Sequence, residues 1–150
     1  MRASEAVDVC EIHVYDGPDT GTSPTTAVPE NAAAAISGCS AAGKPVVAGE
    51  LGYAADLDES GNATGTVTEA TLANRAGFLS ARVEAMSQAG LDGFQVWQLD
   101  DSQPLSDGAD TYAVGPCDPI DSVLRSAAGD STQPVAADGC GLPQEQGSSV

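Results

Sequence analysis

The sequence contains few basic residues, one histidine and few aromatic side chains. Five lysines and arginines stand against 22 aspartates and glutamates in 150 residues, which gives a net charge of −17. Nucleic acids and anionic membranes attract proteins through positive charge, so neither is an expected partner. No apolar run approaches the roughly 18 residues that indicate a membrane span, and the N-terminal residues lack the apolar core of a signal peptide. An uncharged ligand such as a sugar is compatible with this acidic composition.

The four cysteines and the single histidine, His13, lack the spacing of a metal site. No Cys-x-x-Cys pair occurs, so we expect neither a zinc ion nor another cofactor. Four cysteines allow two disulfides in three connectivities. Cys117 and Cys140 flank one predicted helix and a tail, which favours that pair and leaves Cys10 with Cys39. Disulfides indicate an exported protein, and because no export signal is visible we expect a chain that begins partway through a longer, secreted parent.

Strand-like and helix-like segments alternate along the chain. β-Branched, aromatic and other apolar residues predict strands over residues 7–15, 45–49 and 93–99. Apolar periodicity, proline at a first turn and glycine at an end predict helices over residues 29–42, 69–89 and 119–128. In the second helix, Arg75 and Arg82 can lie beside the apolar stripe rather than within it. Small polar residues over 130–150 predict a loose tail, pinned only if Cys140 is bonded.

The strand–helix order predicts an α/β fold of three parallel βα units with right-handed crossovers. The loops that follow the strands are long, and the loops that follow the helices are short. All the long loops therefore lie at the carboxyl edge of the sheet, where barrels and open α/β sheets both form their sites. Three strands cannot close a barrel, which takes roughly 250 residues. The chain is either a small open sheet or part of a larger barrel.

Four side chains that can take part in a reaction or in binding lie near the ends of the predicted strands: His13, Tyr15, Glu50 and Trp97. His13 and Tyr15 are two residues apart and share one face of their strand. A carboxylate directly after an apolar run, as at Glu50, lowers stability if it is buried without a hydrogen-bond partner, so it is expected to have such a partner or a function. Taken alone, Glu50 could cap an element or pair with an arginine, and His13 or Trp97 could be a core residue. Their convergence on one edge favours a functional site.

These residue types suit the cleavage of glycosidic bonds. Cleavage with retention of configuration uses one carboxylate as nucleophile and a second as acid/base, roughly 5 Å apart. A tyrosine hydroxyl next to the nucleophile can keep it ionised, and an imidazole can bind a sugar hydroxyl. An indole ring gives a flat apolar platform for a sugar ring. None of this chemistry needs a metal or cofactor.

Three motifs carry a resemblance to a known family. His13-Val14-Tyr15, the Gly-Lys-Pro-Val-Val-Ala-Gly-Glu-Leu-Gly segment over 43–52, and Gly-Phe-Gln-Val-Trp over 93–97 resemble strands six, seven and eight of the cellulase and β-mannanase family of glycoside hydrolases (clan A, family five). The resemblance implies a partial (β/α)8 TIM barrel over residues 1–129, followed by the tail over 130–150. By position it implies that Glu50 is the nucleophile and Tyr15 its hydrogen-bond partner.

The resemblance also implies that His13 lines the site and that Trp97 is the stacking platform. Tyr53 and Trp97 are the residues expected to bind substrate, a β-linked glucan, mannan or related oligosaccharide. The family's acid/base glutamate follows an asparagine on strand four, and no Asn-Glu pair precedes His13 here. Glu11 cannot replace it, because it belongs to the same strand as His13.

The isolated chain is therefore expected to be inactive unless a missing N-terminal half-barrel completes it. Two other interpretations remain open. The chain can be a non-catalytic carbohydrate-binding or interaction protein derived from such a barrel. It can also be a small open α/β domain in which Glu50 serves structure only.

Overall fold

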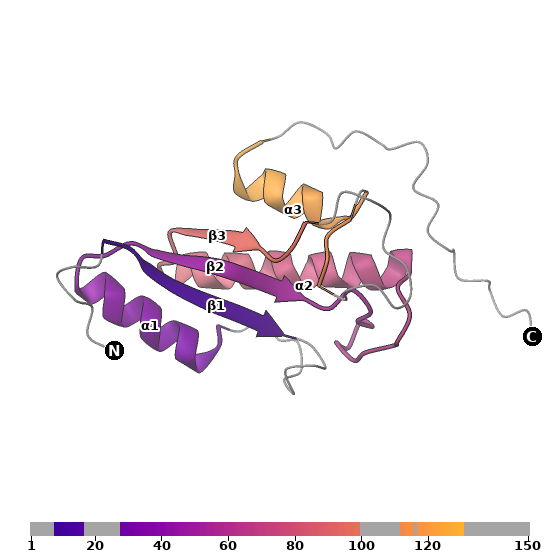
Figure 1. Cartoon of the computed structure of the whole chain (residues 1–150), viewed down its shortest axis with the longest axis horizontal. Helices are drawn as coiled ribbons and strands as arrows, with labels where there is room; N and C mark the ends of the chain where they lie inside the picture. The colour runs from indigo at the N-terminus through magenta and orange to yellow at the C-terminus, as the bar shows by residue number, and fades with distance from the viewer. Residues whose placement is uncertain (1–7, 17–27, 100–111, 116, 131–150) are drawn as a thin grey trace, which may run out of the picture.

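The computed structural model describes residues 8–16, 28–99, 112–115 and 117–130, shown in colour in Figure 1. Six elements alternate in these ranges. Three of them are strands, namely β1 (Cys10–Asp16), β2 (Val46–Tyr53) and β3 (Gly93–Val96), and three are helices, namely α1 (Glu30–Ala41), α2 (Glu69–Gln88) and α3 (Ile120–Ala127). In the described part of the chain, no helix is long and apolar enough to cross a membrane.

The three strands form one parallel sheet in the order β1-β2-β3. Each crossover between neighbouring strands contains one helix, α1 before β2 and α2 before β3. The predicted α/β fold of three parallel βα units is confirmed. β1 and β3 are the two edges of the described sheet, and α3 follows the last strand.

The bounds of β2 and β3 differ from the prediction. β2 was expected to end before Glu50 but continues to Tyr53, because its last residues pair with the second half of β1. β3 is shorter than expected and ends just before Trp97. Just after Trp97, the backbone carbonyl of Gln98 accepts a hydrogen bond from the backbone N–H of Val114 at 2.7 Å. The chain beyond Trp97 thus pairs with the segment that leads into α3.

A bulge in β2 decides which side chains face the helices. Ile12 pairs with Ala48 and His13 pairs with Glu50, so Gly49 is an extra residue without a counterpart on β1. An extra residue reverses the alternation of side chains beyond it. Without the bulge, Glu50 would point toward the core and Tyr53 away from it. With the bulge, Tyr53 enters the core and Glu50 faces the opposite side.

The helices cover one face of the sheet. A single apolar core joins residues of all three helices to alternate residues of the strands: Val14, Ile36, Val46, Ala48, Leu51, Leu79, Met86 and Ile120. These side chains are at most 5% exposed. The opposite face of the sheet carries the polar side chains of the strands, and this separation positions the site described below.

Arg75 and Arg82 of α2, which can lie beside its apolar stripe, are both buried and 0% exposed. The Arg75 guanidinium forms an ion pair with Asp118 and donates a hydrogen bond to the Ala113 carbonyl at 2.9 Å. The Arg82 guanidinium lies over the ring of Tyr53, 5.6 Å from its centre. Burial raises the pKa of Asp118 and lowers that of Arg75, and their mutual attraction opposes both shifts.

Asp118 has a second role at the start of α3. Its Oδ1 accepts a hydrogen bond from the backbone N–H of Ile120, the first residue of α3, at 3.0 Å. One carboxylate therefore fixes both the beginning of α3 and its attachment to α2.

The structure contains the disulfide between Cys10 and Cys39, which ties β1 to α1. Cys117 is also disulfide-bonded. Its expected partner, Cys140, lies outside the described residues, as does the predicted tail from residue 131 onward.

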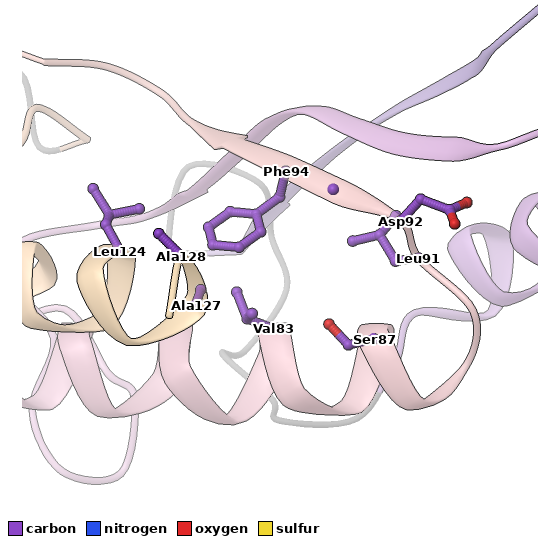
Figure 2. Close-up of a pocket in the computed structure, with 9 residues that line it drawn as sticks. Val83, Ser87, Leu91, Asp92, Phe94, Leu124, Ala127 and Ala128 are labelled. Atoms are coloured by element: carbon purple, nitrogen blue, oxygen red, sulfur yellow. The ribbon is translucent and has the colours of Figure 1, made fainter. Parts of the chain in front are cut away.

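A pocket of about 420 Å³ lies on the helical side of the sheet, where α2, β3 and α3 meet. Figure 2 shows Val83 and Ser87 of α2 facing Phe94 of β3, with Leu124 and Ala127 of α3 closing one end. The pocket is mainly apolar and borders the edge strand of the described sheet.

Candidate active site

Three of the five residues predicted to act in the site lie on the sheet face opposite the helices, and a fourth lies at the carboxyl edge of the sheet. His13 and Tyr15 project from β1, Glu50 from β2, and Trp97 follows the end of β3. Val14, between the first two, points into the core and is 5% exposed, which fixes the orientation of its neighbours by alternation. The bulge at Gly49 brings Glu50 onto the same face.

Glu50 is the centre of this group. Its Oε2 accepts a hydrogen bond from the hydroxyl of Tyr15 and lies 3.2 Å from Nδ1 of His13. The Glu50 side chain is 26% exposed, whereas that of His13 is 50% exposed. The carboxylate is therefore held by two groups from the neighbouring strand and remains in contact with solvent.

The ring of Tyr15 is supported from the side by Tyr112. The two rings meet edge to face with their centres 5.5 Å apart. Both rings lie against Gly52, where a Cβ atom would be 3.0 Å from Tyr112 and 3.1 Å from Tyr15. The missing side chain at Gly52 thus allows the aromatic pair to pack over β2. The sequence marks Tyr112 as one of the few aromatic residues of the long loops, but nothing local indicates its contact with β1.

Trp97 offers an exposed aromatic surface at the carboxyl edge of the sheet, with 45% of its area accessible. Its backbone N–H donates to the Leu51 carbonyl at 3.1 Å, which fixes the base of the side chain next to β2. The stacking role that the sequence suggested for Trp97 stays a prediction.

Tyr53 is located elsewhere. It is 2% exposed, stacks on Phe78 of α2 at 6.0 Å, and lies beneath the Arg82 guanidinium. Its ring has no accessible face with which to contact a sugar, so the expected substrate contact of Tyr53 does not agree with its position. The cause is the bulge at Gly49, which the sequence pattern did not reveal.

The described part of the chain contains no group of three or more His, Cys, Asp or Glu residues arranged to hold a metal ion. Asp58, in the loop after β2, is used locally. Its Oδ1 accepts hydrogen bonds from the backbone N–H groups of Ser60 at 2.9 Å and Asn62 at 2.7 Å. These contacts make Asp58 a turn-forming residue.

The site can present a fixed, partly solvated carboxylate next to a hydroxyl, an imidazole and an indole. Glu11 is the other carboxylate linked to this group by a contact: its Oε1 lies 3.4 Å from Nε2 of His13. It projects from the same strand face as His13.

No protein-family model and no curated protein matches the chain. Among solved structures, it is similar to the hyperthermostable endo-1,4-β-D-mannanase from Thermotoga petrophila RKU-1 with maltose and glycerol. The TM-score is 0.53 at 23% identity, over 83% of this chain and 34% of the mannanase. It is also similar to the endo-β-1,4-mannanase from Thermotoga petrophila, with a TM-score of 0.56 at 20% identity, over 87% of this chain and 28% of that one.

These similarities establish the fold. The chain is a partial TIM barrel of three parallel βα units, and it spans about a third of the length of the mannanases it resembles. The site of a complete barrel of this kind is built from the carboxyl ends of all its strands, and the described residues include three such ends.

Proposed function

We propose that this chain is the nucleophile-bearing part of a retaining glycoside hydrolase of the cellulase and β-mannanase family. Its substrate is a β-1,4-linked glycan, as for an endoglucanase or a β-mannanase. One observation carries the proposal: the Tyr15 hydroxyl and the His13 imidazole both lie at Oε2 of Glu50. A carboxylate held in one orientation by a neighbouring strand is prepared for attack at a fixed point.

In the proposed reaction, Glu50 attacks the anomeric carbon while the glycosidic oxygen leaves, so that a glycosyl ester of Glu50 forms. The leaving oxygen takes a proton from a second carboxylic acid, and water then cleaves the ester. The Tyr15 hydroxyl stabilises the anionic nucleophile by donating a hydrogen bond to it. Trp97 offers its flat face to a sugar ring. This chemistry requires no metal or cofactor.

The acid/base group comes, in this proposal, from a further part of the barrel. A polypeptide that supplies the remaining strands would extend the sheet beyond β1 and β3, the edges of the described sheet. The apolar pocket between α2, β3 and α3 would accept side chains of an added βα unit (Figure 2). Without that completion, we expect the chain to be inactive on natural glycans, because their leaving groups need a proton.

We also propose that the parent protein is secreted. The disulfide between Cys10 and Cys39 supports this location, because such bonds persist in oxidising compartments. The net charge of −17 is compatible with an uncharged polysaccharide as the ligand.

The exposed Trp97 supports a second candidate function, in which the chain binds carbohydrate without cleaving it. An activated substrate separates the two candidates. A dinitrophenyl glycoside of mannobiose or cellobiose needs no acid to release its leaving group, and fluorine in place of the hydroxyl next to the anomeric carbon slows breakdown of the glycosyl ester. The chain alone is therefore expected to release dinitrophenolate and to retain one glycosyl group on Glu50, located by peptide mass spectrometry.

Glu50→Gln is expected to abolish the labelling, whereas Glu84→Gln on the exposed face of α2 is expected to retain it. Binding is followed separately by fluorescence, because Trp97 is the single tryptophan of the chain. A saturable change of its emission with manno- or cello-oligosaccharides, without labelling, would support the binding protein and contradict the hydrolase. Neither labelling nor a fluorescence change would contradict both functions.

A further inference from the structure

The imidazole of His13 lies between two carboxylates. Its Nδ1 is 3.2 Å from Oε2 of Glu50, and its Nε2 is 3.4 Å from Oε1 of Glu11. Glu11 and His13 are two residues apart on β1, so their side chains share one face of the strand. Both ring nitrogens thus face acceptors, one of which is the proposed nucleophile.

Gly49 provides the space in which Glu11 reaches His13. A Cβ atom at Gly49 would lie 1.8 Å from Oε1, 2.6 Å from Cδ and 2.8 Å from Cγ of Glu11. The carboxylate of Glu11 therefore occupies the place that a side chain at residue 49 would take. Gly49 is also the extra residue of the bulge that places Glu50 on this face. The same irregularity positions both carboxylates around the ring.

The two contacts restrict the ring of His13. Rotation of the ring by a half turn would replace both nitrogens by carbons, and both contacts would be lost. A neutral imidazole has one N–H group, and a carboxylate can only accept. Glu11 and Glu50 therefore compete for that proton, through Nε2 and Nδ1 respectively.

We infer that Glu11 is a positioning residue, which fixes the ring orientation of His13 and the division of its proton between the two nitrogens. The proton that His13 offers to Glu50 thus depends on Glu11. The Glu11 side chain is 61% exposed, and an exposed pair of this kind contributes little to stability. Its effect is expected at His13 and Glu50 rather than in folding. The consequence for catalysis rests on the proposed function, whereas the geometry of the ring does not.

The chain offers a direct measurement, because His13 is its only histidine. With ¹⁵N-labelled histidine, NMR resolves the two ring nitrogens without ambiguity and gives the ratio of the Nδ1–H to the Nε2–H tautomer. The ratio is measured at about pH 8.5, where an ordinary imidazole is neutral. In Glu11→Ala it is expected to move toward the Nδ1–H tautomer by roughly two- to fivefold, the range of an exposed charged contact.

Three further variants test the inference. Glu11→Gln keeps an acceptor oxygen and is expected to restore much of the original ratio. Gly49→Ala is expected to act like Glu11→Ala, and to add nothing when the two are combined, because both remove the same contact. Glu84→Ala, on α2, is the matched control and is expected to leave the ratio unchanged.

An unchanged ratio in Glu11→Ala would overturn the inference, and so would a Gly49→Ala effect that adds fully to it. The measurement uses no sugar, so it is independent of the proposed function. A tautomer shift without labelling of Glu50 would contradict the proposed hydrolase alone. Labelling of Glu50 without a tautomer shift would contradict the role of Glu11 alone. Where both hold, the labelling rate is expected to fall in Glu11→Ala and to recover in Glu11→Gln.

Discussion

The hydroxyl of Tyr15 on β1 donates a hydrogen bond to Oε2 of Glu50 on the neighbouring strand β2, 35 residues away in the sequence. In the ladder, Glu50 is paired with His13, and Tyr15 with Gly52. The tyrosine is long enough to reach back along the sheet from this position, while Gly52 leaves room for its ring. The contact therefore depends on the register of two strands and on one glycine.

Removal of that hydroxyl tests its importance. Tyr15→Phe keeps the ring against Tyr112 and loses only the donor to Glu50. Because a hydrogen bond to a charged group is lost, we expect the labelling rate of Glu50 by the activated glycoside to fall roughly 10- to 100-fold. The free energy of unfolding, measured with urea, should change by no more than about 1 kcal/mol. An unchanged labelling rate would show that the hydroxyl does not assist the nucleophile.

Gly52→Ala is expected to disturb the Tyr15–Glu50 hydrogen bond by displacing the Tyr15 ring. The new methyl group would lie 3.0 to 3.1 Å from the rings of Tyr112 and Tyr15, so both must shift. Overpacking of this kind costs about 1–3 kcal/mol of unfolding free energy, and the displaced hydroxyl should slow labelling. Gly77→Ala is the matched control: it lies within α2 with nothing within 4 Å of its Cβ. It should raise stability by about 0.5–1 kcal/mol. Equal effects of the two substitutions would contradict the packing described for Gly52.

The buried ion pair between Arg75 and Asp118 joins elements 43 residues apart. Arg75→Met leaves the Asp118 carboxylate buried without its cation, and we expect a loss of about 3–5 kcal/mol in urea denaturation. Adding Asp118→Asn, which keeps an acceptor for the Ile120 N–H, should recover part of that loss. Arg125 pairs with Asp121 and Asp130 at 38% exposure, so Arg125→Met should cost much less stability than Arg75→Met. If Arg75→Met lowered the free energy of unfolding as little as Arg125→Met, burial would not explain the importance of the Arg75–Asp118 ion pair.

Acid is expected to loosen the turn at Asp58. Hydrogen bonds from Asn62 lower the pKa of Asp58 below the ordinary 3.8, and the bond from its backbone N–H has the largest effect. The stabilisation is therefore present above 3.8 and is lost as the pH falls through the lowered pKa. Hydrogen exchange at the Asn62 amide, corrected for its intrinsic pH dependence, should accelerate as the pH falls from about 5 to about 2. Asp58→Asn, whose amide does not titrate, should remove this dependence. Persistence of the dependence in that variant would assign it to another group.

The sequence alone indicated the order of elements and much of the site. Apolar periodicity defined α2, a proline indicated the start of α3, and alternation placed His13 and Tyr15 on one face of β1. The pairing of Cys10 with Cys39 was one of the expected arrangements. The elements and the shared face of His13 and Tyr15 depend on residues close together in the chain, and four cysteines allow only three pairings. These features can therefore be predicted without knowledge of the fold.

The tertiary structure decided which way Glu50 and Tyr53 point. Alternation along β2 predicts the reverse of what is found, because an extra residue at Gly49 changes the phase of the strand and no local pattern marks it. The burial of Arg75 likewise depends on Asp118, which is distant in sequence. Charge patterns along one helix indicate solvent exposure, unless a partner on another element supplies the opposite charge. The sequence by itself therefore determined the elements and the types of side chain at the sheet edge. The Tyr15–Glu50 hydrogen bond was implied by the resemblance. The tertiary fold decided the other contacts, because these depend on strand register and on residues that meet only when the chain is packed.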